Sequence, residues 1–459
     1  MTNNFRDDFC VQETNKLSDF LAKVGFNDIP KNVIERAKLT IADTFAVALK
    51  GSEEPEMENL YKKIPLDDEA NILKAGFPKT NIAMAGFLNT TSACFVELDE
   101  GTSPSGHPAL HVLPAALAAS QKYKKSGKDL ITSFVLGYEV QNRLQKAMTI
   151  RPEMYPHGNT GHVGATVSVG KLLSWNNEKF REGINCSAAL PLATSHSSSL
   201  TGYSITTVFA SMSPSIAFII ADLVESGFTG FDSALSDTFG TIIGNKFNSE
   251  ELTLNLGKEY GISKNYFKFH ANCALTHPAI EAAADALGFS IQHDVFPPYK
   301  YGRLLKPEEI KSIEIVQGNK SAQRVMNISH NKISAKFSIP YSLSVFLLTG
   351  DASADMYGEK YINDKNINSL EKLITLNIDD SLSGNLWGAK IIINLNNGQV
   401  LTGESKNIYG RQENPANEKD IYNKFSGLTD NLLCESKKNE LWNKIMNLDK
   451  VEDVNELFI

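Results

Sequence analysis

ELDEGTSPSGHP, residues Glu97–Pro108, is a loop sequence that carries three carboxylates and ends in a His-Pro pair. An apolar, alanine-rich run follows at once, from Ala109 to Ala118. Because proline is pre-organised for the first turn of a helix, the pattern predicts a helix start at Pro108. The loop would then bring acids and an imidazole to a helix N-terminus, where free backbone N–H groups favour anions. Proton transfer on a carboxylate fits this pattern, and so does an ordinary acidic surface loop before a capped helix.

A second group of candidate residues lies in residues 151–164, RPEMYPHGNTGHVG. Its three glycines recur every third residue from Gly158 to Gly164, so a helix here has one bare face that another backbone can approach closely. Tight packing explains the glycines but not the flanking imidazoles of His157 and His162. No apolar strand precedes the glycines and no Gly-Lys-Ser/Thr ends them, which excludes a dinucleotide fingerprint and a phosphate-binding loop.

A third run, KFHANCALTHPAIEAA, begins at Lys268 and ends at Ala283. His277 and the proline after it repeat the arrangement of the first loop, with an imidazole at the start of an alanine-rich helix. A cation, Lys268, and a thiol, Cys273, precede it. A single histidine is more often structural than catalytic, but two His-Pro helix starts and one His-Gly turn in one chain indicate a shared site.

Composition limits the class of protein. A chain of 459 residues with 42% hydrophobic content is long enough for two or three domains. The formal net charge of −8 argues against nucleic-acid binding and against a basic membrane-binding face. Five scattered cysteines favour reduced thiols in a cytoplasmic protein, and Met1–Asp8 lacks the pattern of a secretory signal. No Cys-x-x-Cys or His-Glu-x-x-His motif occurs, so the spacing predicts no metal site.

Gly183–Ala221 contains no Asp, Glu, Lys or Arg, but it holds thirteen Ser and Thr residues and two prolines. So many hydroxyls and breaks argue against a membrane span and favour packed core helices. We expect its hydroxyl-rich centre, Thr194–Tyr203, to be a loop that lines or abuts a cavity. The alternative is a buried turn whose hydroxyls bond to the local backbone.

The order of the elements predicts a mainly α protein with a smaller α/β lid inserted into a large helical domain. Helical periodicity dominates from about residue 11 to 260 and returns after Pro415. Between them, Ile310–Val316 and Ala389–Leu395 are strand-like, and the latter leads through an Asn-Asn-Gly turn into Gln399–Gly403. We therefore assign residues 1–263 and 412–459 to the helical domain and residues 264–411 to the lid.

Many short blocks, in order along nearly the whole chain, resemble the MmgE/PrpD family. This family includes 2-methylcitrate dehydratases, cis-aconitate decarboxylases and iminodisuccinate epimerases. The resemblance implies a helical domain interrupted by an α/β lid, a homodimer, and acid–base chemistry that needs no metal or organic cofactor. The blocks are Ala42–Thr44, Asn89–Thr91, Glu97–Gly101, Gly106–Pro108, Leu113–Leu117, Leu136–Val140, Tyr155–Gly158, Gly227–Gly230, Lys268–His277 and Ala335–Tyr341.

The resemblance also implies the candidate site residues. The catalytic candidates are the acid Glu97, which is Asp in several relatives, and the histidines His107, His157 and His277. The substrate-binding candidates are Lys268, Asp99, Gly101, Thr206 and Tyr203.

Three positions depart from the family pattern. Thr206 stands where decarboxylases and dehydratases carry a lysine, Gly101 where decarboxylases have a threonine, and Cys94 where many relatives have a histidine. Because a cation binds a carboxylate more strongly than a neutral donor does, the missing lysine disfavours a tricarboxylate substrate.

The expected task is to move a proton at a carbon next to a carboxylate, which needs a placed base and stabilisation of the developing charge. We expect His157 and His107 to transfer protons, Glu97 to orient one imidazole, and His277 with Lys268 to bind a carboxylate or leaving group and exclude water. A lyase acting on a small carboxylate by dehydration or decarboxylation is the first hypothesis. An epimerase that removes and returns an α-proton and a non-catalytic or repurposed relative are the alternatives.

Overall fold

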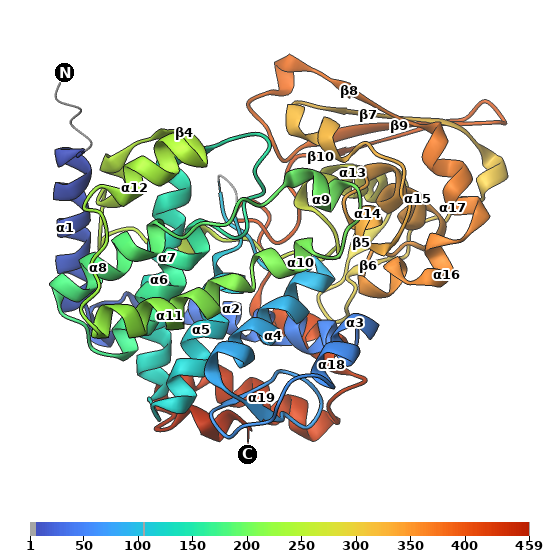
Figure 1. Ribbon diagram of the computed structural model, residues 1–459. Helices are drawn as coiled ribbons and strands as arrows, with labels where there is room; N and C mark the ends of the chain where they lie inside the picture. The colour runs from blue at the N-terminus through green and yellow to red at the C-terminus, as the bar shows by residue number, and fades with distance from the viewer. Residues whose placement is uncertain (1–5, 104–105, 459) are drawn as a thin grey trace, which may run out of the picture.

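The protein is mainly helical, with a small α/β region at one end, as predicted (Figure 1). The computed structural model describes residues 6–103 and 106–458. The predictions made on Met1–Phe5, and the part of the acidic loop at Pro104 and Ser105, lie outside these ranges. The long helices gather in one body, and the four-stranded sheet lies at the upper right of the view.

The helical body is built from amphipathic and wholly apolar helices that bury their faces against one another. The predicted helical stretches near residues 33–43 and 213–223 lie inside α2 and α11, and α5 begins at Pro108 as predicted. The helices of this body before the α/β region are α1 (Asp8–Lys23), α2 (Lys31–Gly51), α3 (Pro55–Tyr61), α4 (Ile82–Val96), α5 (Pro108–Lys122), α6 (Gly127–Ala147), α7 (Thr160–Leu172), α8 (Asn177–Ala188), α9 (His196–Leu200), α10 (Thr206–Phe209), α11 (Met212–Glu225) and α12 (Ala234–Asp237).

The last two helices, α18 (Glu418–Thr429) and α19 (Glu435–Met446), pack against α2 of the body. One ion pair fixes the first of these contacts. Lys424 Nζ lies 2.6 Å from Asp43 Oδ1, and both side chains are fully buried. Lys424 also donates to the Leu98 carbonyl oxygen at 2.8 Å, so α18 supports the start of the acidic loop.

The glycines of the second motif serve helix packing. A Cβ placed on Gly164 of α7 would lie 2.7 Å from the carbonyl oxygen of Gly137 on α6. Real side chains do not approach a backbone so closely, so only glycine lets α6 and α7 meet at this distance. The tight-packing interpretation is therefore confirmed for Gly164, whereas Gly158 lies before α7 with a φ of 87°, in a turn that requires glycine for a different reason.

The α/β region contains a four-stranded sheet in the order β10-β9-β7-β8. The two predicted strands and the predicted hairpin are confirmed as β7 (Ile310–Gln317), β9 (Ala389–Leu395) and β10 (Val400–Ser405). A further strand, β8 (Ile374–Ile378), pairs parallel to β7 and was not predicted. Parallel strands need a long crossover, so no turn signal marks β8 in the sequence.

Helices of this region cover and flank the sheet, and α13 packs against β9 and β10. Its start at His277 agrees with the prediction of a His-Pro helix start. The helices are α13 (His277–Ala286), α14 (Lys332–Lys336), α15 (Ile339–Thr349), α16 (Glu359–Ile362) and α17 (Lys365–Leu370).

The described residues also form three two-stranded ribbons, and two of them lie where only helices were expected. β1 (Ala70–Asn71) pairs with β2 (Lys79–Thr80), and β3 (Met148–Ile150) pairs with β4 (Gly244–Phe247). Strands of two to four residues are too short for an alternating pattern to be visible, so the prediction of helices throughout residues 11–260 was incomplete. The third ribbon joins β5 (Ser290–Ile291) and β6 (Tyr299–Lys300).

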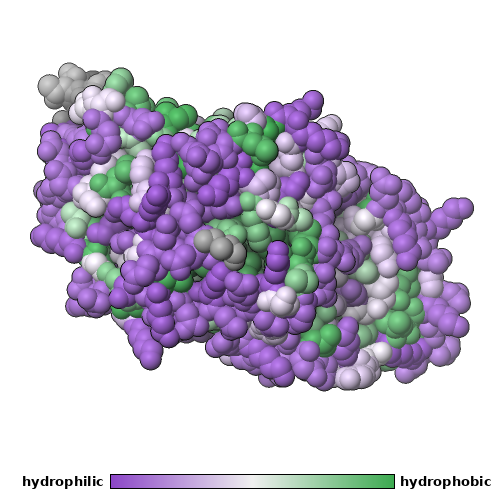
Figure 2. All heavy atoms as spheres, turned by 90° about the horizontal axis from the view of Figure 1, so that it is seen from below, coloured by the Kyte–Doolittle hydropathy of each residue, from purple (hydrophilic) through white to green (hydrophobic). Residues whose placement is uncertain are grey.

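The helical run Thr206–Glu225 is long and apolar enough to cross a membrane by length and composition, but 61% of its most apolar window is buried inside the fold. It packs against α4, α5, α7 and α8, in agreement with the prediction of packed core helices. Figure 2 shows one face of the molecule, where hydrophilic side chains cover most of the surface and hydrophobic ones form separate patches.

Candidate active site

The acidic loop starts with a sharp change of direction after α4. Glu97 is the C-cap of this helix and adopts a left-handed backbone conformation, with φ 55° and ψ 31°. A non-glycine residue in this region carries a conformational cost and is common at functional sites. Its side chain and that of Asp99 are both buried, and they reach the same ammonium group, that of Lys268.

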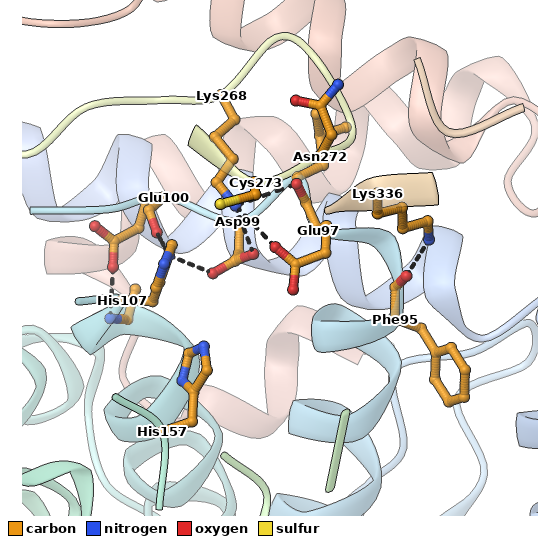
Figure 3. A network of polar contacts seen from close by, with 12 residues as sticks. Phe95, Glu97, Asp99, Glu100, His107, His157, Lys268, Asn272, Cys273 and Lys336 are labelled. Atoms are coloured by element: carbon orange, nitrogen blue, oxygen red, sulfur yellow. Dashed lines mark hydrogen bonds and ion pairs between the residues drawn. The ribbon is translucent and has the colours of Figure 1, made fainter. Parts of the chain in front are cut away.

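Lys268 joins the two carboxylates into one network (Figure 3). Its Nζ lies 3.3 Å from Glu97 Oε2 and 3.5 Å from Asp99 Oδ1, and it donates to the Glu97 carbonyl oxygen at 3.2 Å. Burial lowers the pKa of Lys268, but Asp99 and Glu97 overcome this effect and raise the pKa above its usual range. Lys268 is therefore a permanent cation whose charge is shared between two acids.

His107 is held at the other oxygen of Asp99. Its Nδ1 lies 2.8 Å from Asp99 Oδ2 and 2.7 Å from the Glu100 carbonyl oxygen. Both partners accept, so the ring hydrogen is on Nδ1 and Nε2 is the atom left for a substrate. Burial lowers the pKa of His107, but the Asp99 carboxylate outweighs burial and raises it overall.

His157 lies beside His107, with 5.2 Å between the ring centroids. In Figure 3 its ring points toward Asp99 and His107. Burial, His111 and His107 together lower the pKa of His157 well below its ordinary value. Thr194 donates to the His157 carbonyl oxygen at 2.8 Å, so the hydroxyl-rich segment abuts the site at its first residue.

The rest of that segment agrees with the alternative interpretation in its local hydroxyl bonds, but it is not a buried turn, because Ser195, Ser197 and Thr201 are exposed. It forms α9, and the hydroxyls of Ser199 and Thr201 bond to carbonyls three and four residues earlier. Tyr203 is 66% exposed, and the structure does not bring it to the acid–imidazole network. Thr206 is buried, but its hydroxyl donates to the Tyr203 carbonyl oxygen at 3.1 Å, as part of a local turn.

Gly101 has a structural reason to lack a side chain. Its backbone N–H and carbonyl pair with those of Tyr266, which ties the acidic loop to the segment before Lys268. A Cβ at this position would lie 2.3 Å from the Tyr266 hydroxyl oxygen. The ring of Tyr266 therefore fills the space that a threonine side chain at position 101 would need.

His277 lies in a neighbouring buried group rather than beside the other two histidines. Its ring centroid is 5.1 Å from that of His270, and its Nε2 lies 3.3 Å from the Asn272 carbonyl oxygen. Burial, His270 and Lys268 lower the pKa of His277 well below its ordinary value. Cys273, the residue after Asn272, lies near Lys268 and Glu97 in Figure 3.

Sequence reasoning did not select three further residues of this region: Glu100, Lys336 and His111. Glu100 accepts from the Ala109 N–H at 2.7 Å and from the Tyr138 hydroxyl at 2.8 Å, and burial raises its pKa to about 7. It lies in the first loop, and its burial could not be read from the sequence.

Lys336 of α14 is buried and donates to the Phe95 carbonyl oxygen on the far side of Glu97 (Figure 3). Burial lowers its pKa. His111 of α5 follows His107, the N-cap of this helix, by four residues, and both rings lie beside His157. That spacing was a usable signal.

A cavity of about 630 Å³ lies between α2–α3 and α14–α16, next to the site at Val96. Its charged lining contains more acids than bases, and none of the four catalytic candidates lines it. Such a lining is unsuited to a polycarboxylate. Across residues 6–103 and 106–458, no group of three or more His, Cys, Asp and Glu side chains is arranged to hold a metal ion.

The fold brings paired imidazoles and an acidic network together inside a helical body with an α/β companion. The chain belongs to the MmgE/PrpD family: the model of the MmgE/PrpD N-terminal domain matches residues 15–250, and that of the C-terminal domain matches residues 270–450.

Cis-aconitate decarboxylases from several organisms are similar to this chain over nearly its whole length, at low sequence identity. Cis-aconitate decarboxylase of Mus musculus is 24% identical over 97% of this chain and 92% of its own length. Cis-aconitate decarboxylase of Aspergillus terreus is 24% identical over 97% of this chain and 94% of its own length. The Homo sapiens enzyme of the same name is also 24% identical, over 95% of this chain and 91% of its own length.

Proposed function

We propose that the protein is a lyase that acts on a small carboxylic acid by acid–base chemistry carried by its own side chains. One observation carries this proposal: two imidazoles 5.2 Å apart have pKa values moved in opposite directions, up for His107 and down for His157. Neighbouring titratable groups with separated pKa values are the usual arrangement of a general acid and a general base. The named decarboxylase relatives support the same class.

In this proposal His157 stays neutral and its Nε2 accepts a proton, while the imidazolium of His107 donates one from Nε2. For loss of water, His157 takes the proton from the carbon next to the carboxylate, and His107 protonates the departing hydroxyl. For loss of CO₂, the electron pair of the broken C–C bond stays on carbon, and His107 supplies the proton that quenches it. The nearby Lys268 ammonium stabilises the negative charge that develops on the substrate in either reaction.

The charge of the site supports a substrate with one or two carboxylates. Lys268 already faces Glu97 and Asp99, and Lys336 donates to a backbone carbonyl. Thr206 supplies no cation, and its hydroxyl is used locally. A third carboxylate would therefore enter a site rich in acids without a matching positive partner.

The second candidate function is epimerisation at a carbon next to a carboxylate. The close ring pair favours it as well, because one imidazole can remove a proton while the other returns one from a different direction. Both reactions need the same residues, so only the products separate them.

Incubation of candidate acids in D₂O tests the two functions together. We expect release of water or CO₂ from a mono- or dicarboxylate, with at most weak turnover of cis-aconitate. Deuterium incorporation with inversion of configuration, without release of water or CO₂, would instead establish the epimerase. The same preparation carrying His157→Gln controls for contaminating enzymes, and silence of the unsubstituted protein toward all the acids would refute both functions.

We also propose that the protein is a homodimer, because the segment around α10 and α11 exposes large apolar side chains. Tyr203, Ile205 and Ile219 are 66%, 54% and 55% exposed, and exposed apolar side chains gathered in one segment favour contact with a second chain. Light scattering after gel filtration should give twice the chain mass of 50.4 kDa. Ile219→Lys should shift the mass to that of one chain, and a single-chain mass for the unsubstituted protein would contradict the dimer.

A further inference from the structure

His111 is a buried histidine to which the proposed reaction assigns no role in proton transfer. It lies on α5 one turn after His107, is 1% exposed, and has ring contacts on both nitrogens. Burial, His162 and His107 lower its pKa to about 3, while Asp99 acts in the opposite direction. His111 is therefore neutral at pH 7, with one ring nitrogen that donates and one that accepts.

The two nitrogens face different partners. Nδ1 lies 2.8 Å from the Ser213 hydroxyl oxygen at the start of α11. On the same side of the ring, the Ala210 carbonyl oxygen accepts the Ser213 N–H at 3.0 Å and acts to raise the pKa of His111. Nε2 lies 2.8 Å from Nδ1 of His157. A carbonyl oxygen only accepts, so the ring hydrogen belongs on the Nδ1 side, toward Ala210 and Ser213. Nε2 of His111 is then a bare acceptor.

The fold provides the space for this ring. A Cβ on Gly161 of α7 would lie 2.3 Å from His111 Nδ1, and 2.8 Å from the Ser213 hydroxyl oxygen. A side chain at position 161 would displace both members of the contact. The glycine of the second motif therefore lets α5, α7 and α11 converge on one imidazole.

We infer that His111 is a positioning residue that fixes the hydrogen of His157 on Nδ1 and leaves His157 Nε2 unprotonated and directed toward the substrate. An acceptor opposite His157 Nδ1 allows only that tautomer, since two bare nitrogens at 2.8 Å would repel each other. The same contact fixes the plane of the His157 ring. This inference rests on the proposed role of His157 as the base.

The protonation claim is testable without any substrate. Nitrogen NMR of protein labelled with ¹⁵N-histidine distinguishes protonated from bare ring nitrogens, and loss of signals in His157→Gln assigns the residue among the nine histidines. We expect a neutral His157 ring with its hydrogen on Nδ1 at pH 7. A hydrogen on Nε2 would overturn the inference, whatever the enzyme's reaction proves to be.

Two substitutions then test the positioning role. His111→Gln keeps an acceptor near the place of Nε2, whereas His111→Phe fills the space without one. We expect His111→Phe to lower kcat about 10²-fold or more, with a small change in KM, because a base held in the wrong tautomer loses most of its effect. His111→Gln should recover a large part of kcat and keep the His157 hydrogen on Nδ1.

Ser213→Ala gives a milder check from the other end of the contact, since the Ala210 carbonyl remains on the Nδ1 side of the ring. We expect kcat to fall less than in His111→Phe. Thermal unfolding of each variant shows which ones are folded. Unchanged kcat in a folded His111→Phe variant would exclude the positioning role. Full activity of His157→Gln would instead refute the proposed function and leave the NMR result standing.

Discussion

Replacing His157 by glutamine is expected to lower kcat by about 10²- to 10⁴-fold, the usual contribution of a general base. Glutamine has nearly the same length and keeps an amide to face His111, but it cannot accept a proton near neutral pH. KM should change little if the substrate is held mainly by other groups. Steady-state kinetics on the substrate identified in D₂O, with thermal unfolding of the same variant, is the measurement.

His330→Gln is the matched control, because His330 is an exposed histidine on the edge of the 630 Å³ cavity and away from the paired imidazoles. Its kcat should stay within about twofold of the unsubstituted protein, since substitutions away from such features usually have small effects. A His157→Gln protein that is folded and retains normal kcat would remove His157 from the mechanism.

Replacing Asp99 by asparagine is expected to lower kcat at pH 7 by about 10²-fold or more and to change the pH profile. Asp99 raises the pKa of His107, and the proposed acid is the protonated ring. Activity therefore falls as the pH rises through this pKa. Without the carboxylate the pKa is lower, so the alkaline limb of kcat should move to lower pH, with partial recovery in acidic buffer.

Asp380→Asn serves as the control for this substitution, because Asp380 is an exposed acid in the α/β region whose partner is the exposed Lys320. Its pH profile should coincide with that of the unsubstituted protein. If the alkaline limb of Asp99→Asn stays in place while kcat falls, Asp99 does not set the protonation of His107, and the acid must be sought elsewhere.

Much of this architecture could be predicted from local pattern. Proline after histidine marked the starts of α5 and α13, and alternating β-branched residues marked β7 and β9. These signals are local, since they depend on backbone preference and on which face is buried. β8 has no such mark, because its pairing with β7 is decided by a contact between distant residues.

The candidate site was only partly predictable, for the same reason. The first loop contains Glu97, Asp99 and His107, which the structure brings together. Both carboxylates face Lys268, but Asp99 holds the His107 ring, a role expected of Glu97. Position along the chain could not show that Tyr203 points into solvent, or that the nearest ring to His277 is that of His270. Such placements depend on the packing of whole helices.

The Asp43–Lys424 pair has a consequence for biosynthesis. A chain made from its N-terminus exposes α2 long before α18 exists, and domains tend to fold as units while they emerge. Until Lys424 leaves the ribosome, the Asp43 carboxylate lacks the cation that accompanies it in the finished protein, and burying a lone charge is costly. The helical body therefore completes its interior only after α18 has been synthesised.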